Sequence, residues 1–140
     1  MAENEQAEAL KRAHDAAYNL LTGQFDLGGA FLAGSESQRR FASDFAFGYV
    51  FGFIDALLRV AGITKAAETI TEMAVAYARL FGAEQGPRIL GEALLLREHV
   101  EFSAARLLGA QEVRAWLSQT DNEAPVGLVL YLGRPVNNSD

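Results

Sequence analysis

Residues 41–60, FASDFAFGYVFGFIDALLRV, decide the fold because apolar side chains cover almost the whole circumference of the helix that they would form. Phe41, Phe45, Tyr49 and Phe53 would lie within one sector, and further aromatic and aliphatic residues fill much of the remainder. A helix at the surface of a domain is polar on one side. We therefore expect this helix at the centre of its domain, or buried against a second copy of the chain.

Start and stop signals flank this segment. Ser35 followed by Gln38 three residues later is a capping-box pattern, and Gly62 is the first strong stop after it. These signals predict a helix over about 36–61.

Gly48 and Gly52 form a G-x-x-x-G spacing inside this helix. Each glycine in a helix interior costs roughly 1 kcal/mol relative to alanine, so a close helix–helix contact should offset the loss. Three occupants of that contact stay open: a neighbouring helix of the same chain, a second copy, or a small apolar ligand.

Helical spacing of apolar residues predicts four further helices. Gly23, Gly82 and Gly109 supply stops, and Tyr77 belongs to the core stripe of the helix expected at about 64–81. The fold class is therefore all-α, a bundle of four main helices plus a short fifth, in a single domain over 1–140. The expected ranges are about 4–22, 64–81, 87–108 and 110–119.

The period changes near the C-terminus. Residues 126–132 form a short apolar run between Pro125 and Gly133, which predicts a β-strand. One strand cannot satisfy its own backbone N–H and C=O groups, so we expect it to pair with segment 25–32 or with another protomer. We expect the tail, 133–140, to be flexible.

The strand edge and the apolar central helix together predict a homodimer. The residues expected at its interface are Gly48, Gly52, Val126, Leu128, Leu130 and Tyr131.

Composition and charge narrow the function classes. The 140 residues are 50% hydrophobic, include no cysteine and carry a net charge of -6, so thiolate chemistry is excluded and nucleic-acid binding is not expected. The acidic start at 1–8 is unlike a signal peptide, and the most apolar stretch, 45–54, is too short to span a bilayer. We expect a cytoplasmic protein, and arginine in preference to lysine indicates a GC-rich, bacterial genome.

Motifs for metal or cofactor chemistry are missing from the sequence. Neither His14 nor His99 has a carboxylate at the spacing of a helical metal site, and Gly28-Gly29 lacks the order of a nucleotide-binding loop. We therefore predict no cofactor and no catalytic residue.

The function that this pattern favours is a non-catalytic helical interaction protein that acts as a homo-oligomer. The alternative is a small enzyme or sensor that holds an apolar small molecule between helices, with Tyr49, Asp55 and His99 as polar anchors. Asp55 is also placed to pair with Arg59 at i,i+4, which is the structural interpretation of that carboxylate.

Overall fold

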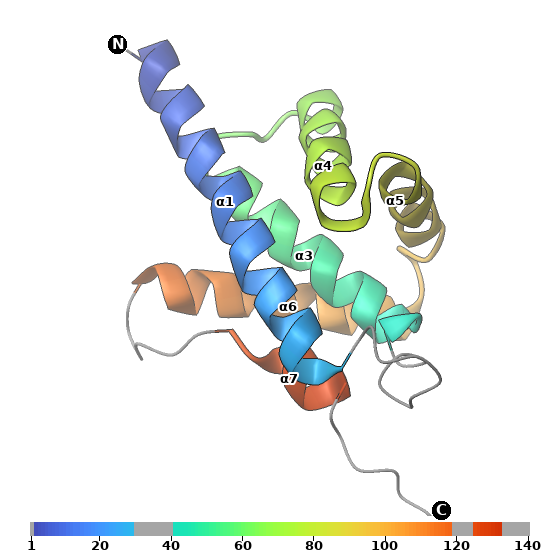
Figure 1. Cartoon of the computed structure of the whole chain (residues 1–140). Coiled ribbons are helices and arrows are strands. Elements are labelled where there is room, and N and C mark those ends of the chain that lie inside the picture. The colour runs from blue at the N-terminus through green and yellow to red at the C-terminus, as the bar shows by residue number, and fades with distance from the viewer. Residues whose placement is uncertain (1, 30–40, 119–124, 133–140) are drawn as a thin grey trace, which may run out of the picture.

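The computed structural model describes residues 2–29, 41–118 and 125–132, and all the regular structure within them is helical (Figure 1). The all-α class is thus confirmed. The segment with Ser35 and Gln38 and the tail 133–140 lie outside the described residues. The helices are α1 (Ala2–Gly28), α3 (Asp44–Val60), α4 (Ala66–Phe81), α5 (Gln85–Leu95), α6 (Val100–Ser118) and α7 (Gly127–Leu132).

Helix α3 is the centre of the fold, and α1, α4, α5 and α6 all pack against it (Figure 1). It begins at Asp44, later than the predicted 36, because Ser43 caps its N-terminus by accepting a hydrogen bond from the N–H of Ala46 at 3.3 Å. At the other end Gly62 has a φ of 91°, and the N–H of Ile63 donates to the carbonyl of Leu58. This is a Schellman motif, which ends the helix.

The contact between α3 and α6 depends on glycine. A Cβ atom at Gly48 would overlap the backbone carbonyl of Phe102, and one at Gly52 would overlap that of Arg106. From the opposite helix, a Cβ at Gly109 would lie 2.5 Å from the carbonyl oxygen of Tyr49. Three missing side chains therefore let the two backbones approach closely.

Two glycines that the sequence predicts as helix stops, Gly109 and Gly23, lie inside helices because packing against other helices holds these segments helical. Gly109 lies inside α6 as a contact residue, so the predicted helices 87–108 and 110–119 are replaced by α5 and α6, which are separated by turns at 96–99. Helix α1 passes through Gly23 and continues to Gly28, because the fully buried side chain of Phe25 holds its last turns against the core.

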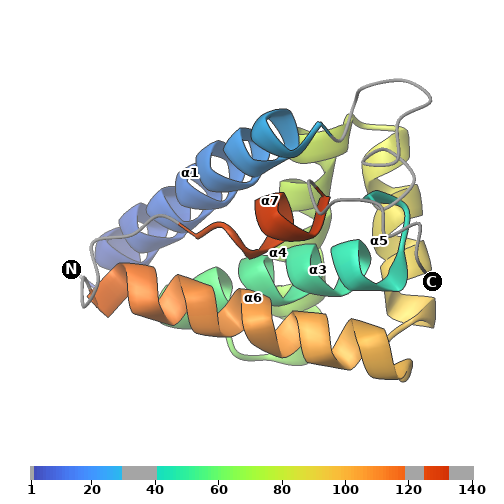
Figure 2. The same ribbon diagram turned by 90° about the horizontal axis from the view of Figure 1, so that it is seen from below.

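The predicted strand at 126–132 is also wrong, because α7 covers Gly127–Leu132. Leu128 and Leu132, four residues apart, are buried, which is helical spacing. Figure 2 shows α7 lying between α1 and α6, and it contacts both. The segment near Phe25 is therefore its neighbour through helix packing, without a sheet.

Helices α4 and α5 form a hairpin beside α3 (Figure 1). Gly86 allows α5 to reach the backbone of Ala78, where a Cβ would lie 2.6 Å from the Ala78 Cα. Arg79 fixes α4 to α1, since it donates to Asp15 at 2.8 Å and lies over the ring of Tyr18. The hairpin and α3 together border the half-open space in which the candidate site lies.

Candidate functional site: a cavity between helices α3, α4 and α5

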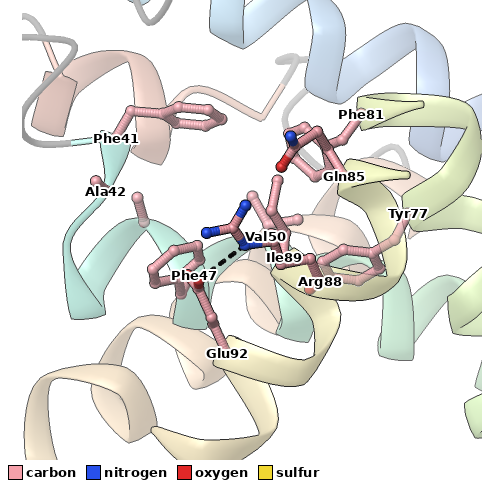
Figure 3. A pocket seen from close by; sticks show the side chains of 11 residues that line it. Phe41, Ala42, Phe47, Val50, Tyr77, Phe81, Gln85, Arg88, Ile89 and Glu92 are labelled. Atoms are coloured by element: carbon pink, nitrogen blue, oxygen red, sulfur yellow. Dashed lines mark ion pairs between the residues drawn. The ribbon is translucent and has the colours of Figure 1, made fainter. Parts of the chain in front are cut away.

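A cavity of about 330 Å³ lies where α3 meets the α4–α5 hairpin (Figure 3). Its walls are mostly apolar, with aromatic rings from all sides but α5. A volume of this size is at the lower end of the range for small-molecule sites. The lining residues are Phe41, Ala42, Ala46, Phe47, Val50, Tyr77, Phe81, Gln85, Arg88, Ile89 and Glu92.

The exposed polar groups of the cavity lie on one helix, α5, at its mouth. Gln85, Arg88 and Glu92 come from successive turns of α5, and all three are exposed. Figure 3 shows Arg88 extending toward Phe47, and its Nε lies 4.0 Å from Oε1 of Glu92. An exposed pair at this distance contributes little to stability, but its two formal charges cancel at the entrance.

Tyr77 is a buried polar residue among those that line the cavity. Its side chain is 1% exposed, and its hydroxyl has no hydrogen-bond partner in the part of the chain that the structure describes. Figure 3 shows its ring reaching from α4 into the space between α3 and α5. Burial raises the pKa of this phenol, so the hydroxyl keeps its proton and remains a donor without an acceptor.

A second buried polar group, Tyr49, is fully satisfied. Its hydroxyl donates to Oε1 of Glu112 at 2.7 Å and accepts from Nε2 of Gln24 at 2.9 Å. Burial, and next the hydrogen bond to Glu112, raise the pKa of Tyr49 above its ordinary value. The phenol therefore stays protonated and links α1, α3 and α6.

The same network holds the start of α7. Oε1 of Glu112 accepts from the N–H of Gly127 at 2.9 Å, and Oε1 of Gln24 accepts from the N–H groups of Leu128 and Val129 at 3.0 and 3.2 Å. The first N–H groups of a helix have no partner within it. Side chains from two other helices supply these partners, and this explains why a six-residue segment is helical here.

Asp55 and His99, the other anchors suggested by the sequence, lie in separate polar contacts. Asp55 binds Arg59 at 3.0 Å, the i,i+4 pair that the spacing indicates, and a second arginine, Arg106, lies 3.7 Å away. His99 is 2.9 Å from Asp44 at the surface. The structure does not bring Tyr49, Asp55 and His99 together, and none of them lines the α3–α4–α5 cavity.

The residues expected at a dimer interface are distributed over buried and exposed positions. Gly48 and Gly52 face α6 of the same chain, and Leu128 is in the core. The ring of Tyr131 stacks on Phe45 with a centroid separation of 4.2 Å. Leu130 of α7 and Val126, which directly precedes the helix, are exposed.

A second pocket has fewer polar residues in its lining than the α3–α4–α5 cavity. A groove of about 310 Å³ lies between α1, α3 and α6, and its lining includes Val60 and Trp116 and, among polar residues, Arg12. Within 2–29, 41–118 and 125–132, no group of three or more histidine or acidic side chains could hold a metal ion. Across those same ranges, every helix is too short or too polar to cross a bilayer.

Comparison with known proteins adds no functional information. No protein-family model matches the chain, and no curated protein or solved structure is significantly similar to it. The function must therefore be argued from the chain's own geometry.

Sequence reasoning placed Tyr77 in a core stripe but missed the site around it. The cavity exists because Phe41 and Phe47, together with Ile89 about forty residues later, do not fill the space where three helices meet. The polar spacing of Gln85, Arg88 and Glu92 is visible in the sequence, but it is also typical of an ordinary solvated helix face.

Proposed function

We propose that this protein binds a small apolar molecule in the cavity between α3, α4 and α5. The observation that carries the proposal is the cavity itself, which has apolar walls and lies beside the central helix. Hydrophobic and aromatic walls with a few polar groups are the usual composition of a ligand site. We assign no catalytic role, because the polar groups at the cavity are an ion pair and an amide.

Filling the mouth of the cavity should weaken binding. Ala42 is exposed and lines the cavity, so Ala42→Trp places an indole over the entrance without disturbing the core. We expect the dissociation constant for isopropylbenzene, measured by titration calorimetry, to rise by about tenfold or more.

The matched control is Ala67→Trp, which adds the same side chain to an exposed position of α4 outside the cavity lining. It should bind isopropylbenzene as the unmodified chain does. Equal binding by the two tryptophan variants would show that the ligand sits elsewhere.

Self-association is a second candidate function, and a separate surface favours it. The outer side of α6 carries Val100, Ala104 and Leu107 at helical spacing, and Val100 and Leu107 are 83% and 55% exposed. The inner side of the same helix packs on α3 through Phe102 and Gly109. Among the described residues, α3 covers the inner side of α6, whereas Val100 and Leu107 on its outer side are exposed.

We propose that a second copy covers the outer side of α6 in an antiparallel, two-fold arrangement. Small residues at Ala104 and Ala115 would allow close approach.

Leu107→Glu should convert this dimer into a single chain. The dimer would then bury two glutamate side chains, one from each copy, where it buried two leucines. The loss of their hydration should raise the dimer dissociation constant roughly hundredfold or more. Light scattering measures the mass directly. The control is Val75→Glu on the outer side of α4, which should leave the mass unchanged, and an unmodified chain with the mass of one copy would refute the candidate.

A further inference from the structure

Two opposite charges at the mouth of the α3–α4–α5 cavity are paired only loosely. Nε of Arg88 and Oε1 of Glu92 are 4.0 Å apart, which is too far for a hydrogen bond. Both side chains line the cavity and both are exposed, so a ligand in the cavity can reach them. The mouth therefore offers a ligand the donors of a guanidinium and, one helical turn away, the acceptors of a carboxylate.

The order of these two charges along α5 is the less favourable one. The N-terminus of a helix is the positive end of its dipole, so acidic side chains stabilise the first turn and basic ones the last. In α5 the first turn carries no acidic residue and the last turn no basic residue. Arg88 lies nearer the N-terminus than Glu92, the reverse of the order that stabilises a helix. A ligand with a negative group at Arg88 and a positive group at Glu92 would offset both charges.

A ligand with a single charge fits this mouth poorly. An anion at Arg88 would meet the carboxylate of Glu92 one turn away, and a cation at Glu92 would meet the guanidinium of Arg88. The chain's net charge of -6 adds to the repulsion of an anion. A zwitterion has no net charge, and its charged groups form hydrogen bonds roughly twice as strong as those of neutral groups.

We propose that the cavity takes a small zwitterion with one apolar substituent, of which an α-amino acid with an aromatic or branched side chain is the simplest class. Its carboxylate accepts hydrogen bonds from Arg88, and its ammonium group donates to Glu92. Its apolar side chain lies among Phe41, Phe47 and Ile89, which line the cavity (Figure 3). This inference rests on the proposed binding function, because it names the ligand class of the same cavity.

The test uses three probes that share a phenyl group on a two-carbon chain: L-phenylalanine, 3-phenylpropionate and 2-phenylethylamine. The second lacks the ammonium group and the third lacks the carboxylate. Each is titrated by calorimetry, near neutral pH, into the full chain and into its variants Arg88→Gln and Glu92→Gln. Both substitutions are at exposed positions, so neither should change the melting temperature appreciably.

L-Phenylalanine should bind the unmodified chain about fivefold or more tightly than either analogue, because each analogue loses one charge-assisted hydrogen bond and keeps one repulsion. Each variant should weaken L-phenylalanine binding by a similar factor. The ranking of the analogues should reverse between the variants, since Glu92→Gln favours 3-phenylpropionate and Arg88→Gln favours 2-phenylethylamine. Isopropylbenzene, which has no charge, should bind all three proteins within about twofold.

Arg12→Gln is the matched control for Arg88→Gln. Arg12 is also exposed and lies 3.9 Å from Glu8 at i,i+4, but it lines the groove between α1, α3 and α6. This substitution changes the net charge equally and should leave the binding of all three probes unchanged. A loss of L-phenylalanine binding as large as in Arg88→Gln would overturn the inference, because net charge or the other groove would then explain the effect.

The isopropylbenzene titration separates the failure of this inference from that of the proposed function. If isopropylbenzene binds but L-phenylalanine binds no more tightly than its analogues, the ligand class is wrong and the cavity still binds. An unchanged ranking of the analogues in the two variants would overturn the inference in the same way. If neither isopropylbenzene nor L-phenylalanine binds the unmodified chain, the proposed function fails together with it.

Discussion

Gly52→Ala is expected to lower the free energy of unfolding by about 2 kcal/mol or more, although alanine is the better helix former. The added methyl group would overlap the carbonyl of Arg106, so α3 and α6 must move apart along their length. Since α1, α4, α5 and α6 all pack against α3, such a shift disturbs most of the core. Thermal unfolding should show the loss as a decrease of roughly 5–10 °C in the melting temperature.

Gly23→Ala is the matched control for this experiment. Gly23 also lies inside a helix, α1, but a Cβ there would meet no atom within 4 Å. The same substitution should therefore stabilise the protein by about 0.5–1 kcal/mol. If both variants change stability in the same direction, close approach of α3 and α6 is not what Gly52 provides.

The second large effect is expected from Gln24→Met, which keeps the volume of a buried side chain and removes its amide. Three hydrogen bonds are lost, two of them from the N–H groups of Leu128 and Val129. Leaving buried donors unsatisfied costs about 1–3 kcal/mol each, so undocking of α7 becomes the easier response. Amide hydrogen exchange at Leu128 and Val129 should accelerate by about a hundredfold, while α3 and α6 remain protected.

The corresponding control is Gln111→Met, at an exposed position of α6. It should leave the exchange rates of α7 unchanged. Unaltered protection of Leu128 and Val129 in Gln24→Met would show that apolar packing of Leu128 and Leu132 alone holds α7 in place. Deleting 125–140 is a poor substitute for this experiment, because it removes core residues as well as any interface.

How far the sequence predicted the fold depended on whether the deciding contact was local. The pattern in 41–60 correctly gave an apolar helix, and Gly48 and Gly52 correctly indicated a close contact. Their occupant, α6, was one of three open alternatives, because a spacing does not identify the surface that fills it. Gly109 has the same role, yet in the sequence it has the appearance of a stop signal.

The apolar run at 126–132 shows a second reason why local sequence did not predict the structure. A short apolar segment without clear periodicity fits a strand or a buried helix. Here Gln24 and Glu112, far away in the sequence, cap the first N–H groups and so select the helix. No local pattern contains that information.

The candidate site was the least predictable part. Tyr49 was expected as a ligand anchor, but its hydroxyl is satisfied by Gln24 and Glu112. Tyr77 looked like an ordinary core residue, and its missing partner depends on which side chains of α3 and α5 surround it. An unfilled space is a property of the whole packing arrangement and has no sequence signature.

The central claim is that the space between α3, α4 and α5 binds a small apolar molecule, and methyl NMR of the unmodified chain during titration with isopropylbenzene tests it most directly. Saturable shifts should appear at the methyl groups of Val50 and Ile89, which line the cavity. Saturable shifts at Val60 and Leu117 instead, in the groove between α1, α3 and α6, would contradict the claim. So would the absence of saturable shifts anywhere in the chain.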